Sequence, residues 1–584
     1  MNGIDKSFKV VVGIDFGSSG SGFAYSFNDE NGIVIGTILG ANVNNKIPTE
    51  IILDNNNKVA TFGSGCSKYI KDKKNKILHY FKDIKMNLYS NKTIIEAKNT
   101  GKTLQLSLVI QKYLEELKSL AISEIKKNRK FIEKSDIKWV VTVPAIWQES
   151  EKGIMMEACI NAGLIGDNDD KSLFFALEPE AASIYCLKNK EIDRNYFQKG
   201  KYYIVSDLGG GTGDIVTHLV GENQKLKEIE CACGGNYGSN EINKKLFKDI
   251  IYKIFGYDNF YNFYENYKKS KVKEKEPEEI LFGMWIELER EINDFKEGAT
   301  IENINENESY PLTLSIFKDM LGEKNDINDL IERYNSICFD EDLKLKVSSK
   351  KRWVIDFPYK IIDHYIQEQA LEICRAIKGI IKTSNKNIDT VILVGGYCAN
   401  EILISTIKKS LIEIKHFLQP SRPCLAIMSG AVIFGINSDI INIRKARYTI
   451  GVSIKDFWDE EKHSKNGIKI WDENSKEWMC GSLFSKFIEI NQDLSVGQKV
   501  THIYYMTDPR YVTMPLYKTK KKNPMYVFEE GVEKIGECRL DTERNNSNDE
   551  RELIETMKFG GTFLNFEAVH VKSGKRIKTT FKFD

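Results

Sequence analysis

Two short stretches of the chain place an aspartate at the end of an apolar run and follow it with a glycine-rich turn. The first runs from Val10 to Asp15 and continues Phe-Gly-Ser-Ser-Gly, and the second runs from Tyr202 to Asp207 and continues Leu-Gly-Gly-Gly-Thr. Glycines let backbone N–H groups point into one small volume, where they can bind a phosphate. A carboxylate at the strand end can hold Mg²⁺ beside that phosphate, often through water. The two stretches therefore predict a site for a metal-bound nucleotide.

Each of these turns leads into another β-type run, so the chain uses one kind of hairpin twice. Such repetition predicts two related halves whose turns face each other across a nucleotide. A third glycine pair, Gly395-Gly396, follows an apolar run and precedes residues at helical spacing, which predicts a strand, a tight turn and a helix. The alternative for any single turn is an ordinary hairpin, in which glycine is common. Asp214, which lies past the second turn, has the weaker claim to a metal, because it could serve only to pin the hairpin.

Other nucleotide and metal motifs do not fit the sequence. The complete P-loop pattern does not occur, and the first turn leads into the strand-like Phe23–Phe27 run instead of the helix that a dinucleotide fold needs. The seven histidines form no H-E-x-x-H arrangement. Cys231 and Cys233 are the only close cysteine pair, and their C-x-C spacing favours buried small side chains over a zinc site.

Length and composition limit the class of protein. A chain of 584 residues is too long for one hydrophobic core, so about two to four domains are expected. Hydrophobic residues make up 41% and charged residues 29%, with a net charge of +1, which is typical of a globular protein and predicts no nucleic-acid partner. No stretch resembles a membrane helix or a secretory signal, and eleven scattered cysteines fit reduced thiols. We therefore expect a cytoplasmic protein without integral membrane association.

The pattern of elements changes along the chain. Helical faces at 106–125, 150–164 and 358–381 alternate with strand-like runs through most of the first 445 residues, which predicts an α/β architecture. From about Arg447 onward, short alternating runs separated by polar turns predict a compact all-β, sandwich-like module. We expect a nucleotide-binding domain at 1–445, with halves at roughly 9–200 and 201–445, and a β-rich substrate- or partner-binding domain at 446–584.

These motifs resemble those of the actin, hexokinase and heat shock 70 kDa superfamily. Asp15-Phe-Gly-Ser-Ser-Gly, the Asp207–Asp214 turn and Val394-Gly-Gly match its two phosphate motifs and its adenosine motif. Thr142–Trp147 (TVPAIW) and Leu177–Ala182 (LEPEAA) resemble connecting segments of the heat shock 70 kDa chaperones, most strongly those of the divergent 12A and 12B branch. The resemblance implies a duplicated actin-like ATPase fold, with two lobes around a nucleotide cleft, that binds ATP or ADP with Mg²⁺.

The resemblance also implies roles for individual residues. Metal binding falls to Asp15 and Asp207. Catalytic roles fall to Lys85, Glu178, Asp207 and Thr212, with Lys82 as the alternative to Lys85. Nucleotide contacts fall to Asp15, Gly17, Ser18, Ser19, Gly20, Gly209, Gly210, Gly211, Thr212, Gly238, Glu289, Gly395, Gly396 and Tyr397. This set suits phosphoryl transfer to water, which needs positioning and charge neutralisation more than a nucleophilic side chain.

The sequence departs from the ordinary family members at several places. Ala399 stands where they place an arginine against the adenine, and Ile292 and Asn293 replace two basic residues of the helix that carries Glu289. We therefore expect adenine nucleotides to bind more weakly or in a different orientation. The segment Ile440–Arg447 is basic where the family linker is acidic, and the chain ends soon after the β-rich segment, so no helical lid is expected.

Three functions follow from these observations. The leading one is a chaperone-type protein in which nucleotide binding, with slow Mg²⁺-dependent ATP hydrolysis, controls the binding of a polypeptide client or protein partner by the β-rich module. The first alternative is a nucleotide-dependent scaffold or sensor with negligible hydrolysis, favoured by the altered adenosine pocket. The second is a small-molecule kinase of the same fold superfamily, which the β-rich tail disfavours.

Overall fold

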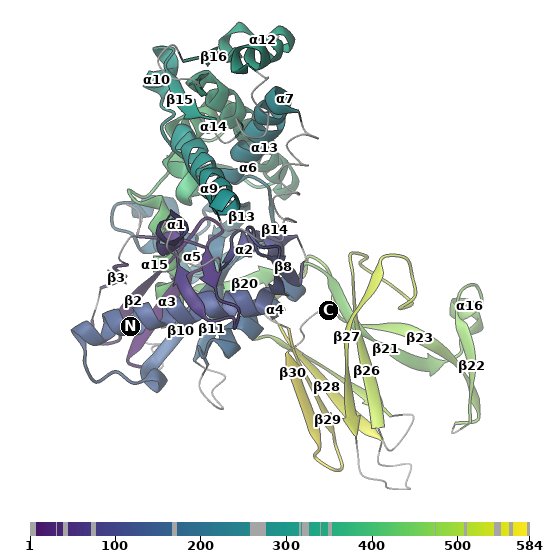
Figure 1. Ribbon diagram of the computed structural model, residues 1–584. Helices are drawn as coiled ribbons and strands as arrows, with labels where there is room; N and C mark the ends of the chain where they lie inside the picture. Colours follow the sequence, from purple (N-terminus) through teal and green to yellow (C-terminus); the bar gives the residue numbers. More distant parts are fainter. Residues whose placement is uncertain are drawn as a thin grey trace.

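A computed structural model of the chain shows two α/β lobes and a β-rich part beside them (Figure 1). It describes residues 8–30, 32–38, 45–71, 78–90, 92–165, 172–256, 276–314, 317, 326–338, 340–348, 353–473, 475–506, 511–541, 551–559 and 564–580, with the side chains of the helix at 276–297 from residue 286 onward. In these ranges no helix is both long and apolar enough to cross a membrane.

The first lobe is built on a sheet in the order β11-β10-β1-β2-β3. Its strands are β1 (Val10–Asp15), β2 (Gly20–Phe27), β3 (Val34–Ile35), β10 (Ile137–Val143) and β11 (Leu173–Leu177). All six residues of β1 are buried, because helices cover both faces of the sheet. Val10 and Val12 pack on the side of α3 (Leu106–Asn128), and Val11 packs on the side of α5 (Glu178–Lys188) and α15 (Ala426–Ile436).

The second lobe repeats this arrangement in its own sheet. That sheet runs in the order β19-β18-β12-β13-β14 and is extended by β20 and β24. Its strands are β12 (Tyr202–Leu208), β13 (Gly213–Val220), β14 (Leu226–Gly235), β18 (Ile388–Val394), β19 (His416–Leu418), β20 (Ile441–Lys445) and β24 (Asp493–Ser495). In the first sheet, β1 pairs antiparallel with β2 and parallel with β10. In the second, β12 pairs antiparallel with β13 and parallel with β18. Strand order and direction are therefore those of one unit used twice.

Helices and a small sheet complete the second lobe at the top of Figure 1. They are α6 (Asn240–Leu246), α7 (Tyr252–Phe255), α9 (Glu276–Glu297), α10 (Ile301–Asn305), β15 (Ser309–Thr313), α12 (Ile327–Ile337), β16 (Lys346–Val347), β17 (Val354–Pro358), α13 (Tyr359–Ser384) and α14 (Glu401–Ser410). The predicted helix at 358–381 is α13, and those at 106–125 and 150–164 are α3 and α4 (Glu149–Asn161). A 3₁₀ turn at Gly396–Ala399 separates β18 from α14, so the predicted helix begins only at Glu401.

Short elements of the first lobe lie beside the space between the lobes. They are β4 (Ile47–Pro48), β5 (Ile51–Leu53), β6 (Val59–Phe62), α1 (Gly65–Lys71), β7 (His79–Phe81), α2 (Ile84–Tyr89), β8 (Ile94–Glu96) and β9 (Thr103–Gln105). Strand β4 pairs with the start of β2, the β7–α2 connection carries Lys82 to Glu289 of the second lobe, and Lys85 lines the cleft from α2. Residues of β4, α1, β7 and α2 therefore supply one wall of the space between the lobes.

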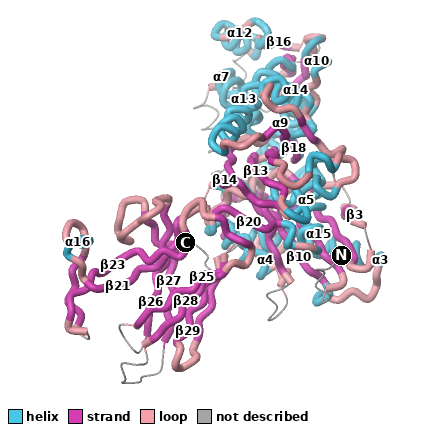
Figure 2. Tube along the Cα trace, turned by 180° about the vertical axis from the view of Figure 1, so that it is seen from behind, coloured by secondary structure: helices cyan, strands magenta, loops and turns pink. Residues whose placement is uncertain are grey.

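After β20 the chain forms two antiparallel sheets that share a core, away from the lobes in both Figure 1 and Figure 2. One has the order β22-β23-β21-β26-β27 and the other β25-β28-β29-β30. Their elements, with one short helix, are β21 (Thr449–Phe457), α16 (Glu460–His463), β22 (Ile468–Asp472), β23 (Glu477–Ile488), β25 (Lys499–Tyr505), β26 (Tyr511–Thr519), β27 (Val532–Asp541), β28 (Glu552–Lys558), β29 (Asn565–His570) and β30 (Arg576–Thr580). The intervening β24 instead pairs with β20, so this part of the chain is tied into the sheet of the second lobe.

The basic segment Ile440–Arg447 is not an exposed connector. Its strand β20 pairs with β14 of the second lobe, and Arg444 is buried, with its guanidinium donating to both oxygens of Glu180 at 2.7 and 2.6 Å. Glu228 accepts a hydrogen bond from the backbone N–H of Lys445 at 2.9 Å. The Arg444 charge therefore anchors this segment to the first lobe, and backbone hydrogen bonds to β14 and Glu228 anchor it to the second.

Candidate nucleotide site

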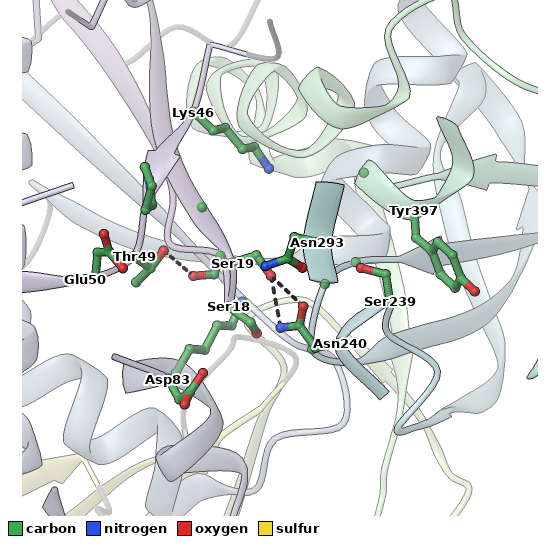
Figure 3. A pocket seen from close by; sticks show the side chains of 18 of the residues that line it. Ser18, Ser19, Lys46, Thr49, Glu50, Asp83, Ser239, Asn240, Asn293 and Tyr397 are labelled. Carbon is green, nitrogen blue, oxygen red and sulfur yellow. Dashed lines mark hydrogen bonds between the residues drawn. The ribbon is translucent and has the colours of Figure 1, made fainter. Parts of the chain in front are cut away.

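A cleft of about 750 Å³ lies between the two lobes, and residues of both lobes line it. Figure 3 shows part of its wall, with Ser18 and Ser19 of the first lobe facing Asn240 of the second. The predicted site residues that line it are Asp15, Gly17, Ser18, Ser19, Gly20, Lys85, Glu178, Asp207, Gly209, Gly210, Gly211, Thr212, Glu289, Gly395, Gly396 and Tyr397. The fold thus brings together residues that are up to about 380 positions apart in the sequence.

The glycines of the second turn are needed because other chain segments lie directly against them. A Cβ at Gly210 would lie 1.9 Å from Oγ of Ser19 in the opposite lobe. Gly238 does not line the cleft; a Cβ there would lie 2.3 Å from the carbonyl carbon of Gly211, so it supports the turn from behind. Alanine at position 210 would push the two turns apart and alanine at position 238 would displace the second turn, because real Cβ atoms do not approach other atoms so closely.

Two polar side chains that the sequence did not single out fix these turns. Asn240, at the start of α6, donates from Nδ2 to Oγ of Ser19 at 3.1 Å, and its backbone N–H donates to the Gly210 carbonyl at 2.8 Å (Figure 3). Thr49 donates from Oγ1 to the Gly17 carbonyl at 2.6 Å. Asn240 thereby links the first turn to the second, and Thr49 fixes the first turn from within its own lobe.

Four buried carboxylates meet at this end of the cleft: Asp15, Glu178, Asp207 and Asp214. Oδ1 of Asp207 and Oδ1 of Asp214 have no hydrogen-bond partner among the described residues, and Asp214 Oδ2 accepts a bond from the Ala145 N–H at 3.3 Å. Burial, reinforced by the negative charge of Glu178, raises the pKa of Asp207 well above its usual value and that of Asp214 to about 7. A cation at this point would relieve both the unmet hydrogen bonding and the like-charge repulsion.

These acids are suited to a divalent cation that binds together with a nucleotide. Carboxylate oxygens are the ligands that Mg²⁺ prefers, and Mg²⁺ usually keeps several waters and takes only one or two carboxylates besides phosphate oxygens. Among the described residues, no three His, Cys, Asp or Glu side chains are grouped so that they could hold a metal on their own. The donor set therefore fits a metal that arrives with phosphates and does not fit a permanent protein cage.

Two lysines neutralise part of this charge. Lys46, which the sequence did not single out, lies with Nζ 2.6 Å from Oδ2 of Asp15. Although burial opposes its charge, the Asp15 carboxylate raises the pKa of Lys46 above its usual value. Lys85 forms a buried ion pair with Glu178 and lies 5.7 Å from the centre of the Trp147 ring. Lys82, the alternative to Lys85, instead pairs with Glu289 of the second lobe.

Helix α9 supplies the wall on the expected adenosine side. Glu289, Asn293 and Lys296 recur at helical spacing on the face that lines the cleft, whereas Ile292 is buried in the core of the lobe. Ile292 and Asn293 replace two basic residues of the family pattern, yet the helix still presents Arg290 and Lys296 to the cleft, with Lys296 one turn beyond Asn293. Its Nζ donates to Oδ1 of Asn293 at 3.1 Å, and burial lowers the pKa of Lys296 to about 8.

The third glycine turn, Gly395–Gly396, borders the cleft with backbone atoms more than with side chains. Gly395 has φ +93° and lies against the Leu208 carbonyl, where a Cβ would come within 2.3 Å. The Tyr397 ring is buried, and its hydroxyl donates to Gln369 at 2.9 Å, so it points into the core of the lobe (Figure 3). Ala399 is exposed and does not line the cleft. The adenosine end is therefore bounded by backbone and by α9, without an arginine at position 399.

Comparison with known proteins agrees with these observations. The model of the family described as Hsp70 protein matches residues 52–258. Heat shock 70 kDa protein 12A of Homo sapiens and of Mus musculus are each 27% identical over 652 aligned positions, which cover 99% of this chain and 92% of theirs. Heat shock 70 kDa protein 12B of Homo sapiens is 26% identical over 99% of this chain and 91% of its own. The similarity predicted from the motifs is confirmed.

Proposed function

Because this chain is a divergent relative of the heat shock 70 kDa proteins, we propose that it binds ATP and ADP in the interlobe cleft and uses the nucleotide to control a polypeptide partner. The observation that carries the proposal is the meeting of the two glycine turns, one from each lobe, at a cluster of buried acids. Backbone N–H groups would bind the phosphates, and the cleft has the volume of an ordinary ligand site.

Mg²⁺ is part of the proposal. Asp207 and Asp15 would hold it, Asp207 through the oxygen that has no partner among the described residues. When bound, the ion supplies positive charge for the phosphate oxygens. The residues of this chain do the positioning: Glu178 and Lys85 orient the water beside the terminal phosphate, and Thr212 lies at the second turn. We propose slow hydrolysis, because the turns and acids are present while the adenosine wall departs from the family pattern.

One structural connection supports communication between the cleft and the β-rich part. Helix α5 begins at Glu178 in the cleft, and two residues later Glu180 binds Arg444 of β20. Strand β20 pairs on its other side with β24, which lies within the β-rich part of the chain. A shift of α5 on nucleotide binding would therefore act directly on the segment that enters the β-rich sheets.

Calorimetry with Mg-ADP and Mg-ATP tests the nucleotide site. We expect Asp207→Asn and Asp15→Asn each to weaken Mg-ADP binding by about 3–10-fold, because each removes a negative charge from the site of the metal. Asp329→Asn, an exposed acid in the first turn of α12, is the matched control and should bind as the wild type does. Unchanged binding in both cleft variants would show that the two-turn site is wrong.

A nucleotide-dependent scaffold that scarcely hydrolyses ATP is the second candidate. It is favoured by the loss of basic residues at Ile292 and Asn293 and by the occupation of Asp15 by Lys46. Single-turnover hydrolysis of ATP separates the two candidates. A measurable rate that collapses in Lys85→Ala supports the ATPase, whereas binding without turnover in the wild type supports the scaffold.

A further inference from the structure

The position of Lys46 has a consequence for how the cleft uses metal. Asp15 is the residue expected to hold Mg²⁺ from the first lobe, yet its Oδ2 lies 2.6 Å from the Lys46 ammonium. Its Oδ1 accepts a longer bond, of 3.5 Å, from the Thr142 hydroxyl. The Asp15 side chain is 2% exposed and that of Lys46 is 15% exposed, so little water competes for either group. A full positive charge therefore already neutralises this carboxylate.

Strand pairing in the first lobe places Lys46 beside Asp15. Strand β4 pairs with the start of β2, opposing Ile47 to Ser21, and so brings Lys46 alongside β2. In the β1–β2 hairpin, Asp15 is the cross-strand partner of Gly22. The Lys46 stem passes over Gly22, where a Cβ would lie 3.3 Å from Lys46 Cγ. The missing side chain at Gly22 leaves the path along which the ammonium reaches Asp15.

We propose that Lys46 is a built-in cation that takes the place of a divalent metal at Asp15, so that the cleft binds nucleotide with little dependence on Mg²⁺. This inference rests on the proposed nucleotide site. Figure 3 shows the Lys46 side chain extending into the cleft, where its ammonium faces the turns that would hold the phosphates. It lines the same cleft as Ser18, Ser19 and the second glycine turn. The ammonium can therefore serve phosphate oxygens as well as Asp15, since its three N–H donors need not all point the same way.

Charge at the phosphate end supports this role. Without Lys46 only Lys85 would face the four carboxylates there, so the Lys46 ammonium reduces the negative charge that a nucleotide entering without metal would meet. A metal ion that approached Oδ2 of Asp15 would have to displace Lys46 first, because both would compete for that oxygen. The two effects act in one direction: they strengthen metal-free binding and weaken the additional benefit of Mg²⁺.

The test measures the ratio of the ADP dissociation constant in EDTA to that in Mg²⁺, by calorimetry on the full chain. For the wild type we expect a ratio below ~10, because the lysine already supplies a charge-assisted contact to phosphate. Lys46→Met should raise this ratio by at least ~10-fold, mainly through loss of binding in EDTA. Lys46→Arg keeps the cation and should retain a ratio close to that of the wild type. Lys244→Met is the matched control, since it removes another lysine that lines the cleft but pairs with Glu241 of its own helix.

Several outcomes would overturn the inference. A wild-type ratio above ~100 would show that the metal is required despite Lys46, and this measurement needs no variant to fold. A Lys46→Met ratio equal to that of the wild type, or a rise of the same size in Lys244→Met, would show that Lys46 has no special role. If Asp207→Asn weakens Mg-ADP binding but these ratios do not differ, the nucleotide site stands and only the lysine inference fails. If the wild type binds neither ADP nor ATP with or without Mg²⁺, both fail.

Discussion

Lys82 of the first lobe and Glu289 of the second form an ion pair that bridges the cleft. Lys82 lies in the β7–α2 connection and Glu289 on α9, and both line the cleft wall. Their side chains are 30% and 28% exposed, so solvent partly screens the pair. The pair is therefore a modest latch between two lobes that must separate for a ligand to enter or leave.

The latch should slow nucleotide release. We expect Glu289→Gln to raise the dissociation rate of ADP by about 2–5-fold, the range that follows from the small free energy of a partly exposed ion pair. The increase should shrink at high salt. Stopped-flow release of a fluorescent ADP analogue measures the rate. Glu287→Gln, which removes a charge paired with Arg290 within the same helix, is the control. Equal release rates in all three proteins would contradict the latch.

Lys85 and Glu178 should contribute to stability as well as to catalysis. Their side chains are only 5% and 8% exposed, so Lys85→Met leaves an unpaired buried carboxylate and should cost about 3–5 kcal/mol of unfolding free energy. The double variant Lys85→Met, Glu178→Gln should recover most of that loss, because neither side chain then carries a charge. Chemical denaturation measures the stability of the wild type, Lys85→Met and the double variant. If Lys85→Met were as stable as the wild type, the Lys85–Glu178 pair would contribute nothing to the free energy of unfolding.

Lys296 should make nucleotide affinity depend on pH. Its pKa of about 8 means that the side chain loses its positive charge as the pH rises from 7 to 9. We expect the affinity of the wild type for ADP to fall by about 3–10-fold more over this range than that of Lys296→Arg, which remains charged throughout. Lys296→Met should be weaker than both at pH 7. Identical pH profiles in the wild type and the arginine variant would exclude a role for this charge.

Glu555 in the β-rich part should make local stability depend on pH. It is buried, its Oε2 has no hydrogen-bond partner among the described residues, and burial raises its pKa to about 8. The folded state thus holds a proton that the unfolded state releases near its ordinary pKa of 4.5. The contribution of Glu555 to stability is therefore highest below pH 4.5 and falls as the pH rises toward 8. Over that range the equilibrium constant for local opening rises by about tenfold per pH unit.

Hydrogen exchange in β25 and β28, corrected for its intrinsic pH dependence, measures this effect. Protection should fall between pH 6 and 8 in the wild type, level off above pH 8, and change much less in Glu555→Gln. Glu530→Gln, at an exposed position of the same part of the chain, should behave as the wild type does. A wild-type profile that the Glu555 variant reproduces would contradict the assignment.

The sequence by itself identified the residues that need special backbone conformations or local chemistry. Asp15, Asp207 and the glycine turns could be recognised because a turn that binds phosphate needs glycine within a few positions of the strand end. The helices α3 and α13 followed from their apolar periodicity, which neighbouring residues alone determine. Local physics was sufficient in each case.

Only the tertiary structure decided which charges face one another. Lys46 is 31 positions from Asp15, Lys82 pairs with a residue 207 positions away, and Arg444 with one 264 positions away. No local pattern encodes these pairings, because they depend on how β4 lies along β2, how the lobes close and how β20 joins its sheet. Lys296 is intermediate: its spacing from Glu289 and Asn293 already put it on their helix face, but only the fold showed that this face lines the cleft.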